Sequence, residues 1–288
     1  MTPNTQTHSA PQPPRPRIAA RRPELPFEGG PIPRHWFGGS ALATHIINGV
    51  NLLFPDGERM FVKSVRYYKD AIANDPMLAK EAAGFYAQEG SHAREHQRFF
   101  EILRDQGYPV DDILVEFRAS LRFFEKVFPP AFHLSATAAA EHFTAIMANH
   151  ALTERVLDEA HPTVRHLLLW HATEEIEHKA VAFDVLAKVE PSYLVRVVGM
   201  AFAALFLAYW WQRATRMFLR HDGIGRAALR AEREKLKQVR DDGGIVKNVF
   251  LAGIKEYLKP GFHPWDRDDL HLAQEYLAET GMDASPAH

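Results

Sequence analysis

Two Glu-x-x-His motifs combine side chains that bind metal ions with positions on the apolar face of a predicted helix. The first is Glu89–His92 within "QEGSHAREH", and the second is Glu175–His178 within "WHATEEIEH". Apolar residues flank each motif at intervals of three and four, so the motif side chains face the core. Carboxylate and imidazole groups are ligands that suit iron, manganese or zinc. The two motifs therefore predict a buried metal site.

Two further glutamates, Glu58 and Glu141, lie on the apolar stripes of two other predicted helices. An unpaired buried carboxylate costs several kcal/mol, so a core with four of them needs cations, and two divalent ions supply four positive charges. One glutamate from each of two helices, with Glu-x-x-His from each of two more, is a pattern that builds a carboxylate-bridged dimetal site in a four-helix bundle. The charge balance thus favours two ions over one, with Glu58, Glu89, His92, Glu141, Glu175 and His178 as ligands.

Helices must position these residues, and the chain has helical periodicity almost throughout, without a convincing strand pattern. Glycine, proline and capping residues predict helices over 40–54, 58–73, 76–105, 111–127, 131–159, 163–189, 192–220 and 226–240, with a break or kink at "PDG" (55–57). Glu58 and Glu89 are 31 residues apart and Glu141 and Glu175 are 34 apart, and each interval fits an antiparallel helix pair. The predicted fold class is all-α, a ferritin-like four-helix bundle with additional C-terminal helices.

The ligand frame resembles that of the ferritin-like non-haem di-iron carboxylate proteins over residues 58–180. Through "FPDGERMF", "QEGSHAREH" and "WHATEEIEHKAVAFDV", the segment from 35 to 275 is also similar to a bacterial family catalogued as predicted metal-dependent hydrolases. His171 precedes Glu175 by four residues, and an added histidine at this turn is similar to that of the p-aminobenzoate N-oxygenase type of di-iron enzyme. By that resemblance His171 is a seventh ligand; the alternative is a core histidine hydrogen-bonded to Glu174 or Glu175.

Four neighbouring side chains are not assigned as ligands. His96 lies one turn beyond His92 on the same stripe and is predicted to support the ligands from outside, with direct ligation as the alternative. Glu174 and Glu177 point off the stripe and are predicted to be solvated or to give similar outer support. His142 follows Glu141 and therefore faces another direction, so it has no predicted role.

The resemblance implies two iron ions, with manganese or zinc as alternatives, and a reaction in which the metal centre oxidises a small organic substrate with dioxygen. A hydrophobic substrate is one option. No side chain is assigned as nucleophile, acid or base. Electrons would come from an external reductase, because the chain has no Gly-rich nucleotide-binding loop. The alternative is a metal-dependent hydrolase that uses metal-activated water on an ester or amide. Iron storage is a third, less favoured class.

Composition bounds the remaining possibilities. The 288 residues include no cysteine, which excludes disulfides and thiolate metal sites, and the net charge of −2 gives no reason to expect nucleic-acid binding. Residues 1–34 carry nine of the 19 prolines and are predicted to be a disordered or extended tail. The helical domain is predicted over 35–245 and a C-terminal extension over 246–288. A cytoplasmic location fits the lack of cysteine, and a homodimer is left open.

A hydrophobic segment, "VVGMAFAALFLAYWWQ", lies within the predicted helix 192–220. It is shorter than the roughly 20 residues of a membrane-spanning helix, but the aromatic residues at its C-terminal end and the arginines that follow resemble an interfacial belt. Three interpretations stay open: a helix buried against the bundle, a contact with a membrane surface or lipid substrate, and a true span.

Overall fold

The computed structural model describes residues 16–27, 30–239 and 246–282, and in these residues the chain is all-α, as predicted. The described ranges contain no strand; an isolated antiparallel bridge joins Phe37 and Ala160. The helices are α1 (Ala41–Asn51), α2 (Phe54–Arg66), α3 (Pro76–Asp105), α4 (Val110–Val127), α5 (Pro130–Thr153), α6 (Pro162–His178), α7 (Val181–Val189), α8 (Tyr193–His221), α9 (Arg226–Val239), η1 (Val246–Leu251), α10 (Ala252–Tyr257), η2 (Pro264–Asp266) and α11 (Leu270–Thr280).

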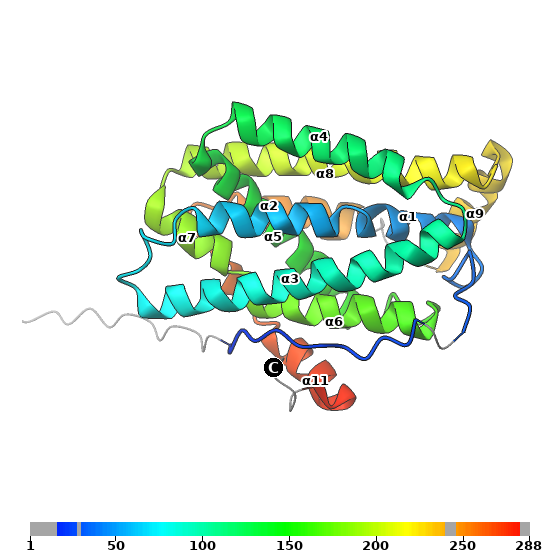
Figure 1. Cartoon of the computed structure of the whole chain (residues 1–288), viewed down its shortest axis with the longest axis horizontal. Coiled ribbons are helices and arrows are strands. Elements are labelled where there is room, and N and C mark those ends of the chain that lie inside the picture. Colours follow the sequence, from blue (N-terminus) through cyan, green and yellow to red (C-terminus); the bar gives the residue numbers. More distant parts are fainter. Residues whose placement is uncertain (1–15, 28–29, 240–245, 283–288) are drawn as a thin grey trace, which may run out of the picture.

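Four helices surround the predicted metal site. Helix α2 packs along α3 and α5 along α6, and the two pairs meet through contacts of α2 with α5 and of α3 with α6. Helices α4 and α8 lie together on one side of this group, at the top of Figure 1, while α11 lies against α6 on the opposite side. The arrangement brings one apolar stripe from each of the four helices to a common centre.

Several helix ends differ from the predicted ones, and two of the differences have a local cause. The break predicted at 55–57 lies earlier, at 52–53: α1 ends at Asn51, and Pro55 lies in the first turn of α2, where a backbone N–H has no partner within the helix. Helix α2 ends at Arg66 rather than near 73. Helix α5 ends at Thr153 rather than 159, because the chain reverses at Arg155 with a φ of 49°.

The predicted single helix over 163–189 is two helices, α6 and α7, and His178 is the last residue of α6. The next residue, Lys179, is buried, and its Nζ donates to Asp269 Oδ1 at 2.5 Å and to the backbone oxygen of Arg267 at 2.8 Å. The C-terminal segment therefore holds the junction between the two helices, directly beside a predicted ligand.

The N-terminal segment over 16–27 is extended, which agrees with one of the two predicted forms, and it lies along the bundle beside α6 (Figure 1). It is not a free tail in this range, since Arg21 and Leu25 are buried. The rest of the predicted tail includes residues 1–15 and 28–29, which lie outside the described residues, as do 240–245 and 283–288. The division of the chain into a domain over 35–245 and an extension stays a prediction.

The predicted hydrophobic helix is α8, which packs against α1 and α5 through one face. It is the one helix of the described residues that is long and apolar enough to cross a membrane, and 28% of its most apolar window is buried inside the fold. The opposite face exposes Leu194, Val198, Leu205 and Tyr209. The prediction of a helix packed on the bundle therefore holds for one face, and contact of the other face with a membrane stays a prediction.

Candidate metal centre

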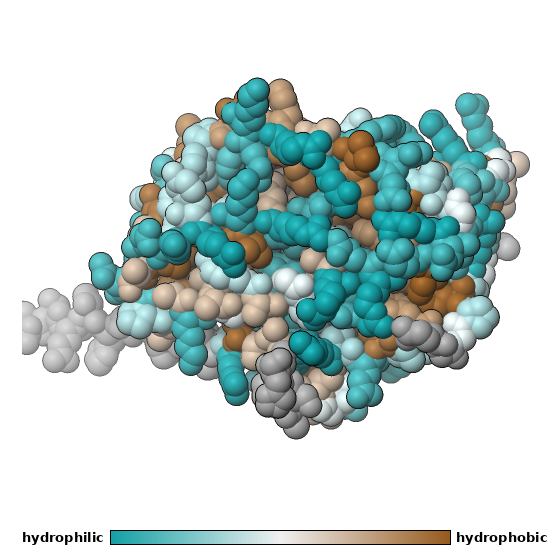
Figure 2. All heavy atoms as spheres, in the orientation of Figure 1, coloured by the Kyte–Doolittle hydropathy of each residue, from teal (hydrophilic) through white to brown (hydrophobic). Residues whose placement is uncertain are grey.

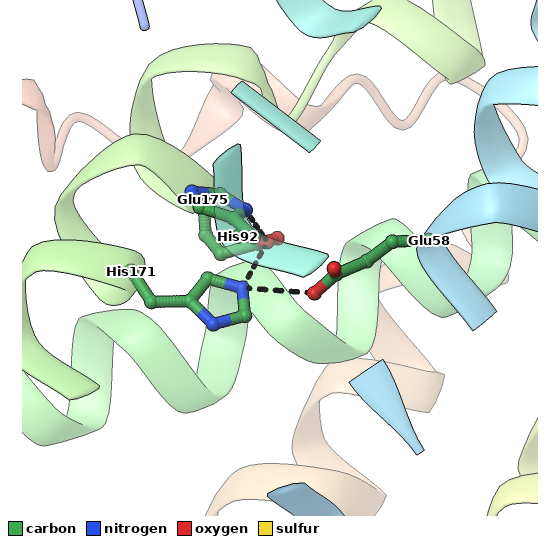
Figure 3. A group of neighbouring side chains, drawn as sticks. All are labelled: Glu58, His92, His171 and Glu175. Atoms are coloured by element: carbon green, nitrogen blue, oxygen red, sulfur yellow. Dashed lines mark hydrogen bonds and ion pairs between the residues drawn. The ribbon is translucent and has the colours of Figure 1, made fainter. Parts of the chain in front are cut away.

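All seven predicted ligands converge at the centre of the bundle, from four helices. They form two groups, Glu58, His92, His171 and Glu175 in one and Glu89, Glu141 and His178 in the other, and in each group the candidate ligand atoms lie within 4.8 Å of one another. Every one of these residues is buried, with at most 5% of its surface exposed. Figure 3 shows the first group, in which the side chains of α2, α3 and α6 point toward one another.

Glu175 faces both groups, one oxygen toward each. Its Oε1 is 2.7 Å from His171 Nε2 and 3.7 Å from His92 Nδ1, within the first group. Its Oε2 is 3.4 Å from Nε2 of His178, which belongs to the second group. A carboxylate placed in this way can bridge two metal ions, so the geometry matches the dinuclear pattern better than a single ion.

Glu89 also faces both groups, although its contacts are longer. Its Oε1 lies 3.5 Å from Nε2 of His178, and its Oε2 lies 3.8 Å from Nδ1 of His92. The two Glu-x-x-His motifs thus each place their glutamate between the groups. Glu89 is therefore a second candidate for a bridging carboxylate, beside Glu175.

Most of the candidate ligand atoms lack a hydrogen-bond partner among the described residues. Both carboxylate oxygens of Glu58, Glu89 and Glu141 are buried without a hydrogen bond, as are His92 Nδ1 and His178 Nε2. Buried polar atoms are nearly always paired, and a set of unpaired acceptors that face one another is the arrangement expected of a cation-binding site. This donor set, made only of oxygen and nitrogen, fits iron, manganese or zinc.

The pKa values of these groups show how strongly the site favours positive charge. Burial, then the charge of Glu175 and Glu141, raises the pKa of Glu58 well above its usual value, and burial with Glu141 does the same for Glu89. Burial raises the pKa of Glu141 to about 7. Although burial opposes it, the carboxylates of Glu175 and Glu141 raise the pKa of His178 to about 10. Divalent cations would replace the protons that these shifts favour.

Each of the three candidate ligand histidines has its second ring nitrogen held from outside the site. Nε2 of His92 donates to Glu174 Oε2 at 3.0 Å, and Nδ1 of His178 donates to Gln88 Oε1 at 2.9 Å. Nδ1 of His171 lies 2.6 Å from Nε2 of His96. Outer contacts of this kind fix the tautomer and ring orientation of metal-binding histidines. His96 and Glu174 thus contact candidate ligand histidines, while their predicted supporting roles and ligation itself stay predictions.

A chain of contacts holds the ring of His171 in place. Nδ1 of His96 contacts Oδ1 of Asn51, and Nε2 of His96 lies 2.6 Å from Nδ1 of His171. Burial, then the charge of His171, holds the pKa of His96 well below its usual value, which keeps the ring neutral. His171 Nε2 lies 2.7 Å from Oε1 of Glu175, the hydrogen bond that the alternative interpretation predicts, and 3.5 Å from Oε1 of Glu58, so it also faces the first group as a candidate ligand.

Glu174 and Glu177 are both buried, so the alternative that they are solvated is wrong. Arg21 from the N-terminal segment donates to both oxygens of Glu177, at 2.7 and 2.8 Å, and its backbone N–H donates to Glu174 Oε1 at 2.9 Å. Gln88 joins this network through a 2.7 Å bond from Nε2 to Glu177. Three residues without a role in the sequence-based prediction, Arg21, Asn51 and Gln88, therefore complete the contacts around the ligands.

Two other histidine sites in the described residues are already satisfied by the protein. His142 Nε2 contacts the backbone oxygen of Gly253 at 2.9 Å, away from the metal site. This agrees with the prediction that His142 faces another direction than Glu141. His35 and His45 both contact Oδ2 of Asp222 at 2.7 Å, and Arg34 Nε lies 3.2 Å from the other oxygen. The charge of Asp222 is therefore balanced without a metal ion.

Replacing His96 by glutamine is expected to weaken metal binding about 10- to 100-fold while leaving the number of ions at saturation unchanged. The reason is that His171 loses the imidazole contact that fixes the orientation of its ring. Competition of the loaded protein against a chelator measures the affinity, and the exposed His221→Gln serves as the matched control. Equal affinities for the two variants would rule out this supporting role.

The fold and the site define a helical-bundle protein with a buried carboxylate–histidine cluster suited to metal ions. Residues 19–268 match the model of a family described as predicted metal-dependent hydrolases, so the chain belongs to that family. The similarity that the motifs indicated is thereby confirmed for this family, and the narrower di-iron resemblance stays a prediction. Among curated proteins and among solved structures, no significant match was found.

Proposed function

We propose that this protein is an enzyme that holds two divalent metal ions within a bundle of the ferritin-like type. One ion would lie among Glu58, His92 and His171 and the other among Glu89, Glu141 and His178, with Glu175 between them. The observation that carries the proposal is the convergence of these ligand atoms in two buried groups in which most of the atoms have no hydrogen-bond partner.

Charge also supports two ions rather than one. Four carboxylates, from Glu58, Glu89, Glu141 and Glu175, share the site, and two divalent cations balance them. The three histidines contribute neutral nitrogens whose other ring positions are held by Glu174, Gln88 and His96. Iron, manganese and zinc all suit this donor set, with iron proposed for oxygen chemistry.

Hydrolysis of an ester or amide is the first candidate reaction, because hydrolysis is the activity that the family description names. Bound metal ions supply it by lowering the pKa of a coordinated water. The chain's own part is to hold the carboxylates and the imidazole rings in fixed orientations. The hydrogen bonds from His92 to Glu174 and from His178 to Gln88 do this at two of the three histidines.

Oxidation of an organic substrate by dioxygen is the second candidate, and a different observation favours it. The cavity that reaches Glu58 is lined by apolar side chains, and Glu58 is the one charged residue among them. A hydrolase gains from an acid beside its substrate to protonate the leaving group, and this lining offers none apart from a proposed ligand. This candidate function includes an external electron donor, because the oxidation needs electrons from outside the chain.

Metal content and two assays separate the candidates. We expect two metal equivalents per chain after loading, and fewer than two at saturation would contradict the dinuclear proposal. Hydrolysis predicts cleavage of p-nitrophenyl esters by zinc-loaded protein under nitrogen. Oxidation predicts oxygen consumption by iron-loaded protein after chemical reduction, without ester cleavage. His221→Gln, which changes an exposed residue, serves as the control in both assays.

A further inference from the structure

We infer that the metal centre acts on an uncharged apolar group, a hydrocarbon chain or ring that is held in the cavity between α2, α4, α5 and α8. The inference rests on the proposed function, since it names the class of substrate for that site. The cavity has an empty volume of about 720 Å³, a figure that includes space open to solvent.

The lining of the cavity selects against charge. Aromatic walls come from Phe117 and Phe124 on α4 and from Phe202 and Phe206 on α8. Apart from Glu58, the one lining side chain with a hydroxyl, amide or charged group is that of Thr144, whose hydroxyl donates to the backbone oxygen of Glu141 at 2.9 Å. A polar occupant would leave its own groups unpaired here, whereas an apolar one gains the full benefit of burial.

The cavity ends at the metal centre rather than elsewhere in the core. Its lining includes the proposed ligand Glu58 and the residue before it, Gly57. Phe54, another lining residue, packs with its ring 4.6 Å from the ring of His171 and 5.0 Å from that of His96. An occupant of the cavity would therefore place an atom beside the group of ligands drawn in Figure 3.

Small residues create the space on the side of α5. Ala136 and Ala140 line the cavity one turn apart, and Ala140 directly precedes the proposed ligand Glu141. Ala203 of α8 also lines it. Larger side chains at Ala136 and Ala203 would fill the volume without replacing a ligand, so they offer a test that separates substrate binding from metal binding.

The outer surface around α4 and α8 is consistent with an apolar ligand. Phe123 on α4 and Leu205 on α8 expose 66% and 74% of their surface, although both helices also supply the inner aromatic walls. Figure 2 shows hydrophobic residues at the surface among hydrophilic ones at the top of the view, where α4 lies in Figure 1. An apolar molecule thus meets apolar side chains both outside and inside this pair of helices.

Calorimetric titration with decan-1-ol tests the inference, with hexane-1,6-diol as the polar comparison. We expect the metal-loaded protein to bind one decan-1-ol and to bind the diol at least tenfold more weakly. Ala136→Phe and Ala203→Phe should each weaken decan-1-ol binding at least tenfold and keep the metal content of the unaltered protein. Ala119→Phe, on the exposed face of α4, is the matched control and should bind as the unaltered protein does.

The outcomes separate this inference from the proposed function. Metal-loaded protein that fails to bind decan-1-ol, or that binds the diol equally well, would overturn the apolar assignment while the metal centre stands. The apolar assignment also fails if both cavity variants fold, keep their metal and bind decan-1-ol normally. Protein that holds no metal but binds decan-1-ol with the expected variant pattern would sink the proposed function and leave the apolar cavity assigned. Two variants on facing helices keep the test valid if one of them fails to fold.

Discussion

Replacing Glu175 by alanine is expected to reduce the metal content from two ions per chain to fewer than one at a metal concentration that saturates the unaltered protein. Glu175 has an oxygen near a histidine of each group, His171 on one side and His178 on the other, and its contacts are shorter than those of Glu89. Its removal deprives both proposed ion positions of an anionic ligand, because Glu175 is shared between them. Loss of a single terminal ligand such as Glu58 should affect mainly one position.

Elemental analysis after dialysis measures this loss, and circular dichroism shows whether the variant keeps its helices. Glu101→Ala is the matched control, since Glu101 on α3 has a side chain that is 70% exposed and pairs with Arg104 at the surface. The control should retain two ions. A Glu175→Ala protein that also retains two would show that the carboxylate is not a shared ligand.

Replacing Arg21 by alanine is expected to lower the free energy of unfolding by about 3–5 kcal/mol, the range for removing one partner from a buried ion pair. The guanidinium, whose side chain is 9% exposed, holds both oxygens of Glu177, and its Nη1 lies 3.5 Å from Glu174. Both glutamates are buried, so the variant leaves negative charge without compensation in the core. The loss should appear as a shifted denaturation midpoint at constant metal concentration.

The neighbouring residue provides the control for this prediction. Arg22 is exposed, so Arg22→Ala should change the stability by less than about 0.5 kcal/mol. Adding Glu177→Gln to Arg21→Ala should restore part of the stability, because it removes one of the stranded charges. If the two arginine variants unfold alike, the N-terminal segment does not contribute the stability inferred from its contacts.

The convergence of the seven candidate ligands could be predicted from the sequence because helical periodicity is local and strong. Spacings of three and four placed Glu89 and His92 on one stripe and Glu175 and His178 on another, and tight packing of the stripes left a single centre for them. The all-α class followed from the same pattern, and the composition gave no competing signal.

The contacts outside the ligand set could not be predicted, because they join residues far apart in the chain. Arg21 lies in a proline-rich segment that favours an extended chain, and nothing local indicates its partner 156 residues away, Glu177. Lys179, at the break after His178, contacts Asp269, which lies in a segment with weak periodicity. Of the residues that the sequence-based prediction missed, Gln88 was the easiest to find, since it lies one turn before His92.

The buried bond between Lys179 and Asp269 bears on the order of events during biosynthesis. The candidate ligands are complete once the ribosome has added His178, but Asp269 follows 91 residues later and holds the residue directly after that ligand. The segment around Arg21, by contrast, is made first and must wait for Glu174 and Glu177. All candidate ligands are therefore present in the nascent chain early. The contact between Lys179 and Asp269 beside them can form only near the end of translation.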